Sequence, residues 1–190
     1  LDYTASASLL PEVKQAMVEV LDEGGNVSSI HQAGQRARRR LERSRAQVAR
    51  LINAAPEELS FTSCGTESNG WALRGLFKAN QPKGRHVVIS GVEHPSVLLT
   101  ARRLELEGAM VSLLPVDQDG VVSPGALRAA LTTETVVVSI MLANGEVGTI
   151  EPIPELAAVA HEQGALFHTD AIAAVGHLGV DVRALGVDAL

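Results

Sequence analysis

The stretch Ala165-Leu166-Phe167-His168-Thr169-Asp170 decides the fold class expected for this chain. Its apolar run is typical of a buried strand, and Asp170 follows where such a strand would meet the edge of a sheet. A carboxylate is costly to desolvate there unless it is paired or hydrogen-bonded. Because no protein cation stands beside Asp170 in the sequence, we expect a cationic partner from elsewhere. The alternative is that Asp170 caps a following helix.

Working outward from this run, short β-branched stretches alternate with helical ones along the whole chain. This alternation indicates a parallel sheet with helices on its faces, so the sequence predicts an α/β three-layer sandwich with a mainly parallel central sheet. The predicted strands span residues 59–62, 86–90, 110–114, 136–141 and 165–169. The predicted helices span residues 11–22, 31–53, 67–78, 96–107, 124–131 and 154–163.

Composition argues against several classes of function. The 190 residues carry a formal net charge of −6, which argues against general attraction to nucleic acid or to an anionic membrane. Arg36, Arg38, Arg39, Arg40, Arg43 and Arg45 alternate with apolar residues at helical spacing, which predicts a solvated helix face or a subunit contact. The single cysteine, Cys64, excludes an internal disulfide, and no apolar stretch has the length of a membrane span. We therefore expect a cytoplasmic protein without nucleic-acid or membrane partners.

A turn of small residues, Ser63-Cys64-Gly65-Thr66-Glu67, precedes one predicted helix. Unpaired backbone N–H groups and the helix dipole favour a phosphate at such a position. Gly65 would let the backbone approach that phosphate closely, and Thr66 could add its hydroxyl. An ordinary capping turn that ends in Glu67 explains the same residues without any ligand, so both interpretations stay open.

Two further polar segments follow predicted strands. His94 comes shortly after the strand at 86–90, and Asn144-Gly145-Glu146 follows the strand at 136–141. The carboxyl ends of parallel strands share one edge of a sheet. His94 could stack on a ring or transfer protons there, or it could cap the next helix. Asn144 could bind a ligand or simply form an Asn-Gly turn. With Asp170, these segments suggest a site for a phosphorylated cofactor with a ring nitrogen.

Taken together, these segments resemble the amino-terminal half of NifS/IscS-type cysteine desulfurases, pyridoxal-phosphate enzymes of the class V aminotransferase group. The resemblance covers essentially the whole chain. The matching residues are Leu1-Asp2-Tyr3, Gly25-Asn26, Ser28-Ser29-Ile30-His31, Phe61-Thr62-Ser63, Gly65-Thr66-Glu67-Ser68-Asn69, Glu93-His94, Ser139-Ile140-Met141, Asn144, Glu146-Val147-Gly148 and His168-Thr169-Asp170-Ala171.

The resemblance implies the large domain of a fold type I pyridoxal-phosphate enzyme. Gly65 and Thr66 would hold the cofactor phosphate, and Asn144 would also contact the cofactor. His94 would be the catalytic residue that stacks on the pyridine ring and assists proton transfer, and Asp170 would pair with the ring nitrogen. No metal ligands are implied. Residues 1–13 would form an amino-terminal arm and residues 14–190 part of the cofactor-binding domain, without the smaller carboxy-terminal domain.

The resemblance also implies an activity. A complete enzyme would take sulfur from L-cysteine onto a catalytic cysteine as a persulfide, release alanine, work as a homodimer and pass the sulfur to an acceptor scaffold protein. The Schiff-base lysine and the loop with the catalytic cysteine have no match in residues 1–190, and Lys14, Lys78 and Lys83 are predicted to be solvated. We therefore expect this chain alone to be inactive unless a complementary carboxy-terminal half completes it. The alternative is a non-catalytic paralogue that acts by association.

One segment and three single positions depart from the family pattern. The segment is Ala5-Ser6-Ala7-Ser8, which stands where a Thr-rich segment that ends in Pro is usual near the substrate. Gly145 stands where an asparagine is usual, Ala173 where a glutamine is usual, and Cys64 where the phosphate turn usually has a glycine. Each lost hydrogen bond would weaken cofactor binding by about 0.5 to 1.5 kcal/mol.

Overall fold

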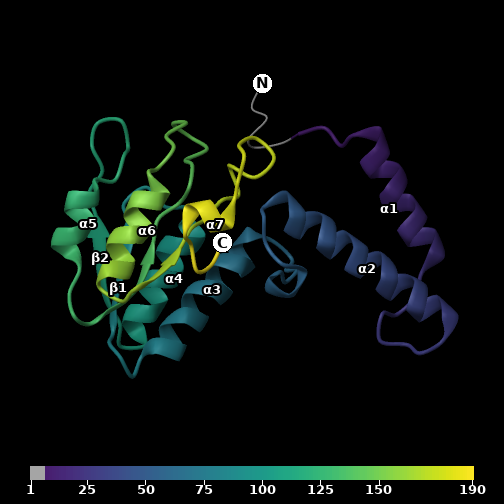
Figure 1. Cartoon of the computed structure of the whole chain (residues 1–190), viewed down its shortest axis with the longest axis horizontal. Coiled ribbons are helices and arrows are strands. Elements are labelled where there is room, and N and C mark those ends of the chain that lie inside the picture. The colour runs from purple at the N-terminus through teal and green to yellow at the C-terminus, as the bar shows by residue number, and fades with distance from the viewer. Residues whose placement is uncertain (1–6) are drawn as a thin grey trace. The chain divides into compact units, whose positions relative to one another are not determined.

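The computed structural model describes residues 7–190 and is drawn in Figure 1. Its described residues fall into two compact units, of which the first ends at Ser60 and the second begins at Phe61. The matching segment Leu1-Asp2-Tyr3 and part of the predicted arm at 1–13 lie outside the described residues. The division into an arm and a partial cofactor-binding domain therefore stays a prediction.

The first unit is helical. It contains α1 (Pro11–Glu23), α2 (Gln32–Leu51) and the one-turn 3₁₀ helix η1 (Pro56–Glu58). Helix α1 begins with Pro11, whose fixed φ suits the first helical position. The Arg40 guanidinium of α2 reaches back to the Glu23 carboxylate of α1 at 3.1 Å. The other arginines of the predicted solvated face that are exposed on α2 are Arg36, Arg38, Arg39 and Arg43.

The second unit is the α/β part of the chain. Its helices are α3 (Gly65–Asn80), α4 (Pro95–Leu106), α5 (Pro124–Ala130), α6 (Ile153–Glu162) and α7 (Val182–Leu185). Its strands are β1 (His86–Ser90), β2 (Met110–Leu114), β3 (Thr135–Ser139) and β4 (Leu166–His168). They form one sheet of order β2-β1-β3-β4, and each neighbouring pair runs parallel.

Helices cover both faces of this sheet. Helices α3 and α4 pack against each other and against the strands on one face, whereas α5 and α6 pair on the other (Figure 1). Every residue of β1 and β3 is buried, as expected for strands covered on both faces. Val87 and Ile89 of β1 join Leu73 and Phe77 of α3 in the main apolar cluster. The predicted three-layer sandwich is therefore confirmed.

The order of the strands creates a switch point between β1 and β3. From β1 the chain continues into α4, which packs against β1, β2 and the neighbouring helix α3. From β3 it continues into α6, which packs beside α5. The two connections thus diverge to opposite faces of the sheet. In open α/β sheets such a divergence leaves a crevice beyond the carboxyl ends of the strands, where ligands bind.

One predicted strand is wrong. Residues 59–62 are not part of the sheet, and the side chain of Phe61 is 47% exposed. The Thr62 hydroxyl contacts the Ser68 hydroxyl at 2.7 Å, which makes this segment the entry turn of α3 instead. A short apolar run becomes a strand only if a neighbouring strand pairs with it. The run itself does not show whether such a neighbour exists. The one-turn helices η1 and α7 were not predicted, because a single turn has no detectable period.

No helix within residues 7–190 combines the length and the apolar character needed to cross a membrane.

Candidate functional site

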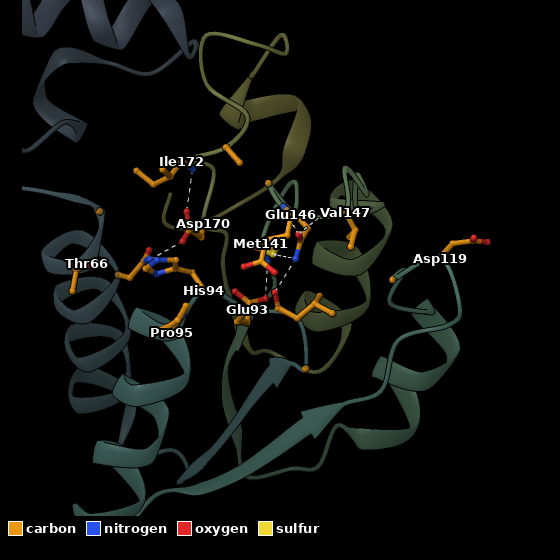
Figure 2. Close-up of a pocket in the computed structure, with 18 of the residues that line it drawn as sticks. Thr66, Glu93, His94, Pro95, Asp119, Met141, Glu146, Val147, Asp170 and Ile172 are labelled. Carbon is orange, nitrogen blue, oxygen red and sulfur yellow. Dashed lines mark hydrogen bonds between the residues drawn. The ribbon is translucent and has the colours of Figure 1, made fainter. Parts of the chain in front are cut away.

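A pocket of about 930 Å³ lies beyond the carboxyl ends of the strands, at the switch point. Its walls come from the start of α3 and from the segments that follow β1, β2, β3 and β4. Figure 2 shows Thr66, His94 and Asp170 on one side, with Glu93, Met141 and Glu146 on the other. All five predicted site residues line this pocket, namely Gly65, Thr66, His94, Asn144 and Asp170. The volume suits a cofactor-sized ligand.

The start of α3 forms one end of the pocket. A Cβ on Gly65 would stand 2.8 Å from the Ile172 side chain, so the glycine permits this close approach. The backbone N–H and the hydroxyl of Ser63 both donate to the Glu67 carboxylate at 2.6 Å, as in the capping interpretation. The helix start also favours negative charge, because the backbone N–H of Glu67 and the hydroxyl of Ser63 lower the pKa of the exposed Cys64 thiol. A phosphate would be favoured there for the same reason.

Asp170 lies two residues beyond the end of β4 and is 5% exposed. Its Oδ2 accepts a hydrogen bond from Asn69 Nδ2 at 2.7 Å, and its Oδ1 accepts one from the Ile172 backbone N–H at 3.0 Å. A turn follows, so the predicted helix-capping alternative is wrong. Both donors are neutral, which leaves the carboxylate able to accept a further bond from a cationic N–H of a ligand.

His94 is both a cap and a pocket residue. It is the N-cap of α4, and its Nδ1 accepts the backbone N–H of Ser96 at 3.1 Å. The Ser96 hydroxyl lies 2.7 Å from the same nitrogen. The capping interpretation is therefore confirmed, and the role of His94 toward a ligand stays a prediction.

Asn144 shapes the loop after β3. Its Oδ1 accepts the backbone N–H groups of Glu146 at 2.8 Å and Val147 at 3.1 Å, and its Nδ2 donates to the Val92 carbonyl at 3.1 Å. The same Nδ2 lies 3.6 Å from Met141 Sδ, a weak acceptor. The turn interpretation is confirmed. The N–H of Asn144 that points to the Met141 sulfur is the one that could donate to a ligand instead.

Glu93 was not predicted as a site residue. It is 5% exposed, and the Ser90 hydroxyl and the Met141 backbone N–H donate to its Oε1 at 2.5 and 2.8 Å. Its Oε2 has no hydrogen-bond partner among the described residues. Burial, with smaller contributions from the charges of Asp170 and Glu151, raises the pKa of Glu93 to about 8. Burial therefore favours the protonated form of Glu93 well above the pH at which an ordinary glutamate ionises, and the side chain braces the segments after β1 and β3.

Two departures from the family pattern meet in this pocket. A Cβ on Gly145 would lie 3.6 Å from the Cβ of Ala173, and both residues line the pocket. The third departure, Cys64, lies at the start of α3 in the same lining. The pocket lining contains no lysine. Lys78 lies instead on the surface, 3.6 Å from the Glu107 carboxylate.

The arrangement fits a phosphorylated pyridine. The N-terminus of α3 would hold the phosphate, and Asp170 would accept a hydrogen bond from the protonated ring nitrogen. The imidazole of His94 lines the same pocket. Asn69, Ser96 and Glu93 complete the site. They stand within or beside motifs already singled out in the sequence, but no local signal assigned them a role.

Comparison with known proteins agrees with this fit. The family model described as Aminotransferase class-V matches residues 1–190. Cysteine desulfurase IscS of Dictyoglomus turgidum is 47% identical over 100% of this chain and 48% of its own length. The chain thus spans about half the length of the curated relatives it matches.

Solved structures agree as well. One described as a NifS-like protein superposes with a TM-score of 0.95 at 33% identity, over 99% of this chain and 53% of that one. SspA in complex with cysteine superposes with a TM-score of 0.93 at 31% identity, over 98% of this chain and 54% of that one. The chain belongs to the class V aminotransferase family, on the NifS/IscS branch that the sequence indicated.

Proposed function

We propose that this chain is the cofactor-binding part of a pyridoxal-phosphate-dependent cysteine desulfurase. The observation that carries the proposal is the single pocket into which the start of α3, His94 and Asp170 all project. The identity of 47% to a cysteine desulfurase IscS supports the same activity. When bound, the cofactor supplies an electron sink for reactions at the carbon atoms of an amino acid.

Each pocket residue has its own proposed contact with the cofactor. The first-turn N–H groups of α3, with the Thr66 hydroxyl, would bind the phosphate. Asp170 would accept a hydrogen bond from the ring nitrogen and keep that nitrogen protonated. His94 would pack on the ring and hold or move a proton at Nε2, and Asn144 would donate an N–H from the loop after β3.

The proposed substrate is L-cysteine, in line with the solved relative described as a complex with cysteine. The net reaction moves the cysteine sulfur to an enzyme thiol, so that the C–S bond breaks, a persulfide S–S bond forms and alanine leaves. A homodimer, a sulfur-acceptor scaffold protein and a cytoplasmic location belong to this proposal through the relatives named IscS.

The pocket lining contains no lysine that could form a Schiff base with the cofactor. Residues 1–190 alone should bind pyridoxal phosphate without a covalent bond to the pocket and should not release alanine from cysteine. A lysine-bearing carboxy-terminal half would complete the enzyme.

A titration of the purified chain with pyridoxal phosphate, followed by absorbance, tests the proposal. Asp170→Asn should weaken binding by about tenfold or more, because it removes a charged hydrogen-bond acceptor. Asp119→Asn is the matched control, since Asp119 also lines the pocket but lies away from Asp170 (Figure 2). Equal affinity of the native chain and Asp170→Asn would refute the assigned cofactor site.

The second candidate is a non-catalytic member that acts by association. The facing pair of Gly145 and Ala173 favours it, because both positions lack the side-chain amides usual in the family. Absence of any saturable binding of pyridoxal phosphate, even with an added carboxy-terminal half, would favour this candidate over the enzyme.

A further inference from the structure

The side chains of Asp170, Asn69, Ser96 and His94 form one continuous chain of hydrogen bonds, and all but Ser96 line the pocket. Asn69 Nδ2 lies 2.7 Å from Asp170 Oδ2 and 2.9 Å from Ser96 Oγ. Ser96 Oγ in turn lies 2.7 Å from His94 Nδ1. Asn69 and Ser96 are 4% and 6% exposed, so water competes little for these bonds. The chain joins α3, the first turn of α4 and the segment after β4.

The direction of each bond follows from the chemistry of the groups. Both carboxyl oxygens of Asp170 accept, Oδ1 from the Ile172 backbone N–H and Oδ2 from Asn69, so Asn69 turns its NH₂ rather than its oxygen toward Asp170. The same NH₂ group donates its other hydrogen to Ser96 Oγ. The Ser96 hydroxyl has a single hydrogen of its own, and its remaining partner is His94 Nδ1.

His94 Nδ1 therefore receives donors only. The Ser96 hydroxyl and the Ser96 backbone N–H both point to this nitrogen, at 2.7 and 3.1 Å. A neutral imidazole carries its proton on one nitrogen and accepts at the other. Nδ1 is thus bare and the proton lies on Nε2, which makes no hydrogen bond to any residue within 7–190.

We infer that Asn69 and Ser96 are positioning residues that set the tautomer of His94 and the orientation of Asp170 through this single chain of bonds. The nitrogen available to a ligand is then Nε2, while Asp170 keeps one oxygen directed by Asn69. The inference deepens the proposed function and rests on it for the roles of His94 and Asp170. The geometry of the tautomer does not depend on the cofactor.

Nitrogen-15 NMR of the full 190-residue chain without cofactor tests this directly. Long-range proton–nitrogen correlation spectra distinguish the two tautomers of each of the 6 histidines, and the signal lost in His94→Gln identifies His94. The native chain should show the Nε2–H pattern alone. An Nδ1–H pattern or a mixture in the native chain would overturn the inference.

Variants of Ser96 and Asn69 distinguish an effect on the His94 tautomer from a purely structural role. Ser96→Ala removes the hydroxyl at 2.7 Å and leaves only the backbone N–H at 3.1 Å on Nδ1, so an Nδ1–H population should appear beside the native tautomer. Ser96→Thr should retain the native pattern alone. Asn69→Leu should also release the tautomer and should weaken pyridoxal phosphate binding by about tenfold, since Asp170 loses its directing bond. An unchanged tautomer in folded Ser96→Ala would contradict the inference. If Ser96→Ala does not fold, the native spectrum and Ser96→Thr still decide.

The two claims fail separately. A mixed tautomer together with tight pyridoxal phosphate binding would overturn the positioning role alone. A fixed Nε2–H tautomer without any cofactor binding would overturn the proposed function alone.

Discussion

The side-chain amide of Asn69 donates a hydrogen bond of 2.7 Å to Asp170, although 101 positions separate the two residues in the chain. Asn69 lies in the second turn of α3, and the first turn of the same helix contributes Gly65 and Thr66 to the pocket. The bond therefore ties α3 to the segment after β4, so a displacement of α3 would disturb Asp170 as well.

Restoring the two missing amides should strengthen cofactor binding. Gly145→Asn and Ala173→Gln should each tighten pyridoxal phosphate binding by about 2- to 10-fold, the effect of one added hydrogen bond. A Cβ is accommodated at 145, because it would meet the nearest atom, Ala173 Cβ, at 3.6 Å. At that separation the double variant should depart from additivity. Absorbance titration of all four proteins checks this, and unchanged affinity in both single variants would contradict it.

The stability of the fold should fall as the pH rises through the neutral range because of Glu93. The pKa of Glu93 is raised from 4.5 to about 8 in the fold, so between these pH values the unfolded chain releases a proton that the fold keeps. The free energy of unfolding therefore loses up to about 1.4 kcal/mol per pH unit from this residue.

Glu93→Gln cannot titrate and should gain stability relative to the native chain as the pH rises from 4.5 to 8. Urea unfolding at several pH values measures the difference. Glu162→Gln is the matched control, because Glu162 lies on the surface with Arg128. If the difference in the free energy of unfolding between Glu93→Gln and the native chain stays constant with pH, the raised pKa of Glu93 is contradicted.

The acid side of the stability profile should depend on His168. Burial lowers the pKa of this histidine from 6.5 to about 4, so it is neutral in the fold. Between these values the unfolded chain takes up a proton that the fold excludes, and stability falls as the pH falls. His168→Asn can keep a contact to the Ser139 hydroxyl, which lies 2.8 Å from Nδ1, and should show a flatter profile from pH 6.5 to 4.

Thermal unfolding across this pH range compares the native chain with His168→Asn and with His177→Asn, a control at an exposed histidine. If the stability of His168→Asn falls with pH in parallel with that of the native chain, His168 is not the cause of the loss of stability at acid pH.

Cys64 should react as an activated thiol. Its pKa is lowered from 9.0 by the backbone N–H of Glu67 and the Ser63 hydroxyl, so its alkylation by iodoacetamide at pH 7 should exceed that of free cysteine. Each unit by which a pKa falls raises the thiolate fraction about tenfold in this range. Inorganic phosphate or pyridoxal phosphate should slow the reaction, because the anion would occupy the same helix start. Cys64 is the only cysteine, so mass spectrometry reads one site. Reaction at the rate of a free thiol, without protection, would argue against the phosphate position.

Much of the second unit could be predicted from sequence because its signals are local. The bounds of β1 and β2 agree with the predicted 86–90 and 110–114, where short β-branched runs end at turns. The run at 59–62 has a similar pattern but no place in the sheet, since pairing depends on a neighbour that the run itself does not specify. His94, Asn144 and Asp170 share one pocket because parallel strands bring their carboxyl ends to one edge. Gly65 and Thr66 join them from the start of α3, which follows no strand.

The sequence by itself determined which residues follow the strands and start α3, because hydrophobic periodicity and turn chemistry act over a few neighbouring positions. Only the tertiary structure decided that Asn69 donates to Asp170 and Ser96, that burial raises the pKa of Glu93, and that Gly145 faces Ala173. Hydrogen-bond direction and desolvation depend on distances in space between residues far apart in the chain, and no local pattern encodes them.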